Sequence, residues 1–121
     1  MSKVSKILIV DDEAQIRGLL ALAFKGAGYV VATAKNGRDA IASCARESFD
    51  VVLSDVIMPE INGHELAQWI AVHRPATRTA LMSGFDAESR ERPSSRACRL
   101  ISKPFQTRQV VAFVDEVLAG Q

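Results

Sequence analysis

Short apolar runs alternate with longer segments in which apolar residues recur every three or four positions. The runs are rich in β-branched residues, as is typical of parallel strands buried on both faces, and they occupy residues 7–10, 29–34, 51–54, 79–82 and 100–101. Each run is followed by a segment with helical periodicity. Five strand–helix repeats predict an α/β fold in which helices cover both faces of one parallel sheet.

The helical segments differ in how clearly their ends are marked. Glycines in residues 26–28 predict the end of the first helix, and Asn36 marks a turn or cap before the second. Thr107 is the expected cap of the last helix. Residues 85–97 contain Pro93 and few apolar residues. Because a proline in a helix interior costs about 3 kcal/mol, we expect a short or irregular fourth helix there.

Length and charge narrow the possible functions. The 121 residues show no linker or shift in composition, so we expect a single domain over residues 1–121 with no effector domain. Fifteen Lys and Arg stand against fourteen Asp and Glu, a balance that argues against direct binding of nucleic acid. The first apolar run is too short for a signal peptide or a membrane span, which favours a cytoplasmic protein without membrane insertion.

The two cysteines do not form a recognisable metal or redox motif. Cys44 and Cys98 lie far apart and no Cys-x-x-Cys is present. In a cytoplasmic protein they are expected to be reduced, partly buried thiols.

Polar residues stand directly after four of the predicted strands. Asp11 and Asp12 follow the first strand, Asp55 the third, Ser83 the fourth and Lys103 the fifth. Right-handed crossovers bring the carboxyl ends of parallel strands to one edge of the sheet, so we expect these side chains to meet there. Three close carboxylates repel one another, and a hard divalent cation such as Mg²⁺ removes that cost. Carboxylates, a hydroxyl, an ammonium and Mg²⁺ together predict a phosphoryl-transfer site.

Each of these residues also has a simpler explanation when it is taken alone. Asp11 and Asp12 suit the N-terminus of a helix, Asp55 and Ser83 suit turns, and Lys103 suits the solvated surface. The convergence of all five on one sheet edge favours the functional interpretation.

Four segments carry a resemblance to a known family. They are Ile9-Val10-Asp11-Asp12, Ser54-Asp55-Val56-Ile57-Met58-Pro59, Met82-Ser83-Gly84 and Ser102-Lys103-Pro104-Phe105. In this order, and each at the end of its strand, they resemble the receiver domain of two-component response regulators over nearly the whole chain. The resemblance implies a flavodoxin-like doubly wound fold with strand order 2-1-3-4-5.

The resemblance also implies a role for each residue at the strand ends. Asp55 corresponds to the phosphoryl acceptor, Ser83 to the switch hydroxyl and Lys103 to the ion-pair partner of the phosphoryl group. The implied ligands of Mg²⁺ are Asp11, Asp12, Asp55 and the backbone carbonyl of Ile57. The implied partners are a histidine kinase or histidine phosphotransfer protein and an unidentified downstream protein. Such a domain assists its own phosphorylation and its slow dephosphorylation.

A departure from the family pattern keeps other functions open. Leu100 stands where receivers usually carry an aromatic switch residue, so we expect any switch to work through the loop after Ser83, with Phe85 as the moving group. A phosphorylation-independent interaction module of the same fold is therefore an alternative. A Mg²⁺-dependent phosphohydrolase with an aspartyl nucleophile is a weaker one, because Ile57 stands where such enzymes place a second aspartate.

The remaining distinctive side chains are interpreted as structural or surface groups. His64 and His73 have no matching carboxylate or cysteine and are expected on the surface, and Trp69 is expected to pack against the core. The arginines of residues 90–99 form either a solvated face or a surface for an acidic partner.

Overall fold

The computed structural model describes residues 4–83, 98–103 and 105–120, and within them five parallel strands form one sheet. In chain order the strands are β1 (Lys6–Val10), β2 (Val30–Ala34), β3 (Val51–Asp55), β4 (Arg78–Ser83) and β5 (Cys98–Ser102). They lie side by side in the order β2-β1-β3-β4-β5, and every neighbouring pair is parallel. The flavodoxin-like strand order expected from the sequence is confirmed.

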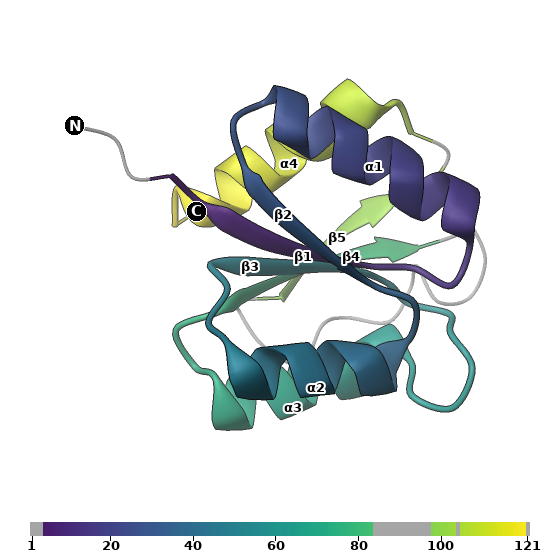
Figure 1. Cartoon of the computed structure of the whole chain (residues 1–121), viewed down its shortest axis with the longest axis vertical. Helices are drawn as coiled ribbons and strands as arrows, with labels where there is room; N and C mark the ends of the chain where they lie inside the picture. Colours follow the sequence, from purple (N-terminus) through teal and green to yellow (C-terminus); the bar gives the residue numbers. More distant parts are fainter. Residues whose placement is uncertain (1–3, 84–97, 104, 121) are drawn as a thin grey trace.

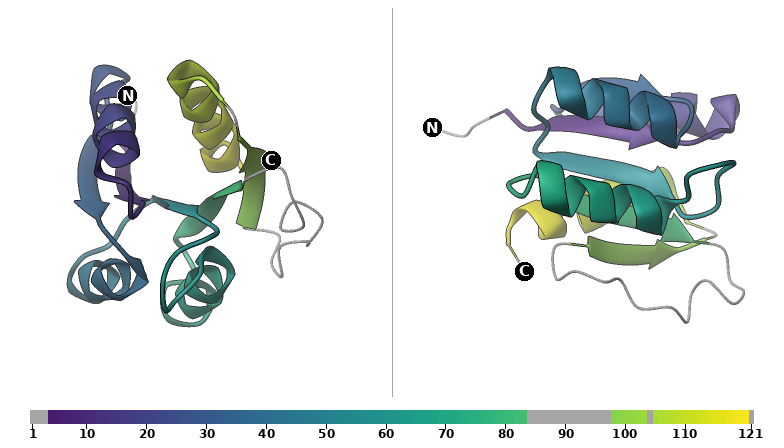
Figure 2. Two further views of the ribbon diagram at one scale, coloured as in Figure 1. Left: turned by 90° about the vertical axis from the view of Figure 1, so that its right-hand side faces the viewer. Right: turned by 90° about the horizontal axis from the view of Figure 1, so that it is seen from below.

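The described helices cover the sheet on both faces. They are α1 (Ala14–Gly26), α2 (Gly37–Arg46), α3 (Gly63–His73) and α4 (Thr107–Leu118). Helices α1 and α4 lie on one face, and α2 and α3 lie on the other (Figures 1 and 2). The irregular helix expected over residues 85–97 lies outside the described residues, as does Phe85.

The alternation of side chains along the strands explains why the sheet needs a helical layer on each side. In β1, Ile7 and Ile9 belong to the core beneath α1 and α4, whereas Leu8 and Val10 belong to the core above α2 and α3. All four side chains are fully buried. A strand with apolar residues at every position is stable only where both of its faces are covered.

The ends of the first two helices agree with the sequence. The side chain of Asn36 accepts a hydrogen bond from the backbone amide of Asp39 at 2.8 Å, which caps α2. After α1, Gly28 has a φ of 96°, a left-handed conformation that glycine adopts without steric cost.

The expected capping role of Thr107 is wrong. Thr107 is the first residue of α4, and the N-cap is Gln106, whose backbone amide donates to the side-chain oxygen of Gln109 at 2.7 Å. A long amide side chain from the third helical position reaches the helix start here, so the nearest hydroxyl is not needed as a cap.

His64 is less exposed than the sequence led us to expect. His64 lies in the first turn of α3 and is half-buried, and its buried Nε2 finds no hydrogen-bond partner in the described residues. His73 is exposed as expected. Its ring stacks on Trp69 with centroids 4.3 Å apart, and Trp69 in turn packs against the core above α2 and α3.

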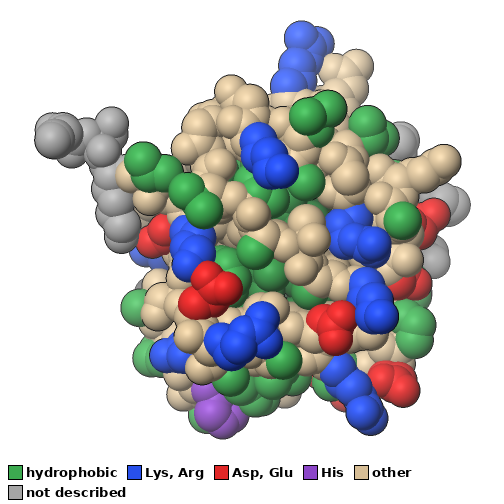
Figure 3. Space-filling model, viewed as in Figure 1, with side chains coloured by type: hydrophobic (Ala, Val, Ile, Leu, Met, Phe, Trp, Pro, Cys, Tyr) green, Lys and Arg blue, Asp and Glu red, His purple; other side chains and the backbone are tan. Residues whose placement is uncertain are grey.

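The free, buried thiol of Cys44 agrees with the expectation from the sequence. Acidic and basic side chains are interspersed on the face of the molecule shown in Figure 3, rather than gathered by charge. Cys44 is buried and free, and burial raises the pKa of its thiol. Arg99 is half-buried, and its guanidinium lies over the ring of Phe113 at 5.9 Å. Among the described residues, no helix is both long and apolar enough to cross a bilayer.

A glycine at the start of α3 lets this helix approach the end of β3. A Cβ on Gly63 would lie 2.5 Å from the backbone oxygen of Asp55 and 2.8 Å from the Cα of Val56. Both are backbone atoms, so the clash is relieved only by moving the strand end or the helix.

We therefore expect Gly63→Ala to lower the free energy of unfolding by about 2 kcal/mol, because it overpacks this contact. Chemical denaturation measures the change. Gly18→Ala in α1 is the control, because nothing lies within 4 Å of the added methyl group. The free energy of unfolding of Gly18→Ala should rise by about 0.5 kcal/mol, because alanine has a higher helix propensity than glycine. Equal stability of the two variants would contradict the close approach.

Candidate functional site

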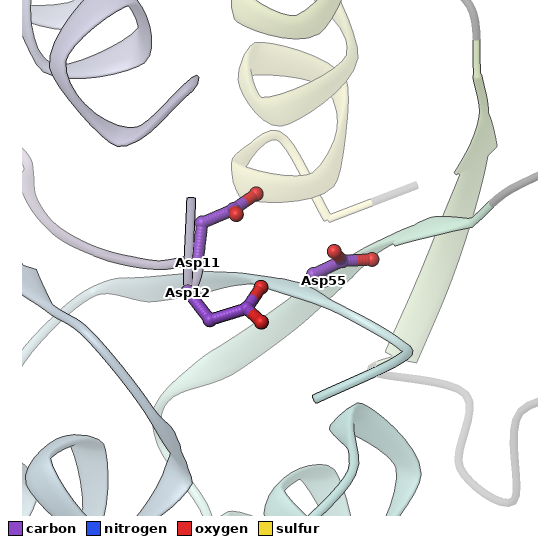
Figure 4. Close-up of side chains that lie close together, drawn as sticks. All are labelled: Asp11, Asp12 and Asp55. Carbon is purple, nitrogen blue, oxygen red and sulfur yellow. The ribbon is translucent and has the colours of Figure 1, made fainter. Parts of the chain in front are cut away.

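The carboxyl edge of the sheet gathers three carboxylates from two strands. Asp11 and Asp12 directly follow β1, and Asp55 is the last residue of β3. Since β1 and β3 are neighbours, the three side chains converge, as Figure 4 shows. Each offers a carboxylate oxygen, and these atoms all lie within 4.8 Å of one another. The predicted juxtaposition of the acidic residues is therefore present.

Asp11 is held rigidly and keeps one oxygen without a partner. Its backbone amide donates to the carbonyl of Ala34 at 3.2 Å, and its Oδ1 accepts from the amide of Glu13 at 2.8 Å. The residue is fully buried, and Oδ2 has no hydrogen-bond partner among the residues that the structure describes. A buried carboxylate oxygen without a partner is costly, and a cation bound among the three carboxylates would satisfy it. The residues present fit a divalent cation with oxygen ligands.

A lysine balances part of the negative charge. Nζ of Lys103 lies 3.3 Å from Oδ2 of Asp55, and it donates a hydrogen bond to that oxygen. The backbone amide of Lys103 donates to the carbonyl of Ser83 at 2.6 Å. This bond connects the segment after β5 to the end of β4. It thereby fixes the backbone of Lys103 at the same sheet edge as Asp55.

Ser83 and Ile57 complete the set of residues expected at the site. Ser83 is the last residue of β4, is fully buried, and is in register with Ser102 of β5. Ile57 lies in the loop after β3, and its side chain is exposed. The role expected for its backbone carbonyl as a metal ligand stays a prediction.

Burial and like charge shift the titration of the cluster. Burial raises the pKa of the Asp11 carboxyl, and the negative charges of Asp55 and Asp12 raise it further. Burial also raises the pKa of the Asp55 carboxyl, although the nearby Lys103 ammonium opposes this shift. Both carboxyls therefore hold a proton more readily than an exposed aspartate when no metal is bound.

Two neighbouring polar groups were not predicted from the sequence. The hydroxyl of Ser54 donates to the carbonyl of Asp55 at 2.9 Å, and the guanidinium of Arg17 donates to the carbonyl of Asp11 at 2.8 Å. Ser54 lies inside an apolar run, which was a signal that its hydroxyl needs a partner. Arg17 lies six residues beyond Asp11, and no short motif joins the two.

Comparison with known proteins agrees with this geometry. Residues 7–115 match the family model of the response regulator receiver domain. The chain belongs to this family. Its members are parts of two-component systems, in which receiver domains interact with histidine kinases and with downstream effectors.

Relatives of this receiver include both short and long proteins. The chain is 32% identical over 117 residues to the response regulator receiver protein CpdR of Brucella abortus, and the match covers 95% of this chain and 98% of CpdR. It is 34% identical over 116 residues to the transcriptional regulatory protein ResD of Bacillus subtilis, where it spans only 48% of the protein. The structure resembles the chemotaxis response regulator CheY4 of Vibrio cholerae, with a TM-score of 0.86, 27% identity and 95% of this chain covered.

Removing one charge from the cluster should stabilise the metal-free receiver. Asn at position 11 keeps an oxygen for the Glu13 amide but loses the buried charge, so Asp11→Asn should raise the free energy of unfolding at pH 7 by on the order of 1 kcal/mol. The measurement is chemical denaturation in EDTA across a pH series.

The sign of the pH dependence follows from the raised pKa of Asp11. The unfolded chain loses this proton near the ordinary value of 3.8, and the folded chain loses it only at higher pH. The carboxyl therefore destabilises the wild type increasingly as the pH rises from about 3.8 to the raised pKa of the folded state, and this cost stays constant at higher pH. The advantage of Asp11→Asn should appear in that window and vanish below it. An advantage that persists unchanged at pH 3 would contradict the electrostatic explanation.

Proposed function

We propose that this receiver accepts a phosphoryl group on Asp55 in a Mg²⁺-dependent reaction, from the phosphohistidine of a histidine kinase or histidine phosphotransfer protein. The observation that carries the proposal is the placement of Asp55. It shares a cluster with two further carboxylates and lies 3.3 Å from the Lys103 ammonium. We propose that the signal then passes to a downstream protein through altered protein contacts, in the cytoplasm and without direct binding of nucleic acid.

The carboxylates of Asp11, Asp12 and Asp55, with the backbone carbonyl of Ile57, would hold Mg²⁺. Bound there, the ion supplies positive charge that neutralises phosphoryl oxygens. The orphaned Oδ2 of Asp11 supports this assignment, because it is the buried oxygen that most needs a cation. Asp12 is exposed, so it is open to an ion that arrives from solvent.

Asp55 acts as the nucleophile in this proposal. One of its carboxylate oxygens forms a bond to phosphorus while the phosphorus–nitrogen bond of the donor breaks, and the electron pair of that bond stays on the imidazole nitrogen, which takes up a proton. Lys103 stabilises the phosphoryl oxygens through its ammonium group. The hydroxyl of Ser83 donates a hydrogen bond to the new phosphoryl group. Slow attack of water on the acyl phosphate restores the aspartate and releases phosphate.

The output step has to proceed without the aromatic residue that receivers usually carry. Leu100 is half-buried and packs against a small cluster of Val56, Ala67 and Leu81. A leucine side chain in this position has no large planar ring to swing between two orientations. We therefore propose that a change at Ser83 is transmitted through the loop that follows it. Phe85, the residue expected to move there, lies outside the described residues.

Incubation with Mg²⁺ and acetyl phosphate, followed by intact-mass spectrometry, tests the proposal. We expect a long-lived phosphoryl adduct on the wild type and no adduct on Asp55→Asn, because the amide is not a nucleophile. Asp39→Asn is the matched control, since Asp39 is an exposed aspartate in the first turn of α2, and it should be phosphorylated like the wild type. An unmodified wild type would favour the phosphorylation-independent interaction module. Rapid phosphate release without an adduct would favour the phosphohydrolase.

Loss of the Lys103 ammonium should slow phosphorylation without abolishing it. We expect Lys103→Met to reduce the initial rate of adduct formation by about 10²-fold, the typical effect of removing one group that stabilises transition-state charge. Rates of adduct formation under saturating Mg²⁺ give the measurement, and Lys25→Met, which removes an exposed lysine from the last turn of α1, is the control. A wild-type rate in Lys103→Met would argue that the ion pair with Asp55 is only structural.

A further inference from the structure

Arg17 reaches back from α1 to the loop that carries two of the three carboxylates. It is half-buried in the first turns of the helix, and its Nη1 donates to the backbone carbonyl of Asp11 at 2.8 Å. The loop is thereby tied to the helix that follows it. On its other side, the amide of Asp11 is tied to the carbonyl of Ala34 at the end of β2.

We propose that Arg17 is a positioning residue for the cation site, acting through the Asp11 carbonyl, and this inference rests on the proposed function. The carbonyl of Asp11 belongs to the peptide unit that joins Asp11 to Asp12. This unit is planar, so holding its oxygen also restricts the backbone of Asp12. One guanidinium thus sets the orientation of two carboxylate-bearing residues.

The other hydrogen bonds of Asp11 show what the arginine adds. The amide and Oδ1 of Asp11 are already occupied by Ala34 and Glu13, which leaves the carbonyl as the polar backbone group that needs a further partner. Arg17 supplies a charged donor, which makes a stronger hydrogen bond than a neutral one. With these three groups satisfied, Oδ2 is the polar atom of Asp11 that lacks a partner within the described part of the chain, and it remains for a cation.

The charge of Arg17 and its positioning role predict opposite effects on the affinity for Mg²⁺ when this arginine is lost. Among the described residues, Arg17 forms no ion pair, because no carboxylate oxygen lies within 4.0 Å of its guanidinium. The positive charge of Arg17 is therefore not neutralised by such a pair. A nearby positive charge repels Mg²⁺, and its removal alone should tighten binding. If positioning dominates, removal should instead weaken binding, as is typical when a residue that orients a metal ligand is lost.

Calorimetric titration of the full chain with MgCl₂ distinguishes the two effects. We expect Arg17→Met to raise the dissociation constant for Mg²⁺ by about tenfold. Arg17→Lys keeps the charge and a donor, and it should recover most of the lost affinity. Arg46→Met is the matched control, because Arg46 is exposed in the last turn of α2, at the opposite edge of the sheet, and its loss should leave Mg²⁺ binding unchanged.

Unchanged or tighter binding by Arg17→Met would overturn the inference, and so would equal losses in Arg17→Met and Arg17→Lys. Thermal unfolding of each variant in EDTA verifies that the metal-free proteins are folded at the titration temperature. A variant that is unfolded there would be titrated at a lower temperature at which it is folded.

Hydrogen exchange separates failure of this inference from failure of the proposed function. If the wild type binds no Mg²⁺, the proposed function is wrong, whereas the positioning role is still tested at the Glu13 amide that donates to Asp11 Oδ1. In metal-free protein, Arg17→Met should accelerate exchange of this amide by about tenfold, because the loop opens more often. A wild-type exchange rate there would overturn the positioning role independently of any metal.

Discussion

The mutual repulsion of three carboxylates is the constraint on which this structure depends. Asp11, Asp12 and Asp55 bring oxygens within 4.8 Å of one another, and Asp11 is fully buried. Burial and like charge both raise the pKa of Asp11, and Lys103, which forms an ion pair with Asp55, opposes this shift only in part. The metal-free protein therefore carries an electrostatic cost at this edge. Such a cost is expected where a divalent cation and a phosphoryl group are to be bound.

Packing beneath the site keeps the repelling groups together. Every residue of β3 is buried, so the strand that ends in Asp55 has cores on both faces. Gly63 lets α3 lie directly against the end of this strand, and Arg17 ties the loop after β1 to α1. The carboxylates cannot relax apart without breaking these contacts. A rigid support of this kind orients ligands before a cation arrives.

The same edge also links the site to the strands beside it. The amide of Lys103 donates to the carbonyl of Ser83, and Ser83 is in register with Ser102, so the ends of β4 and β5 are joined. Leu100 lies two residues before Ser102 in β5, and it packs against a small apolar cluster. Leu100, which stands where receivers usually carry an aromatic residue, thus has a packing role.

The sequence by itself predicted the fold class and the meeting of three aspartates at one sheet edge, because apolar runs require burial and because parallel strands collect their carboxyl ends at one edge. Local spacing does not reveal contacts between distant residues. The half-buried position of His64, with its Nε2 shielded from solvent, depends on the packing of α3. The cap of α4 was missed for another reason, because the short-range pair Gln106 and Gln109 competes with Thr107 at the helix start. Only the tertiary structure brought Arg17 to the Asp11 carbonyl and left Oδ2 of Asp11 without a partner in the segments that are described. These features depend on where side chains end in space, and pattern and composition carry no record of that.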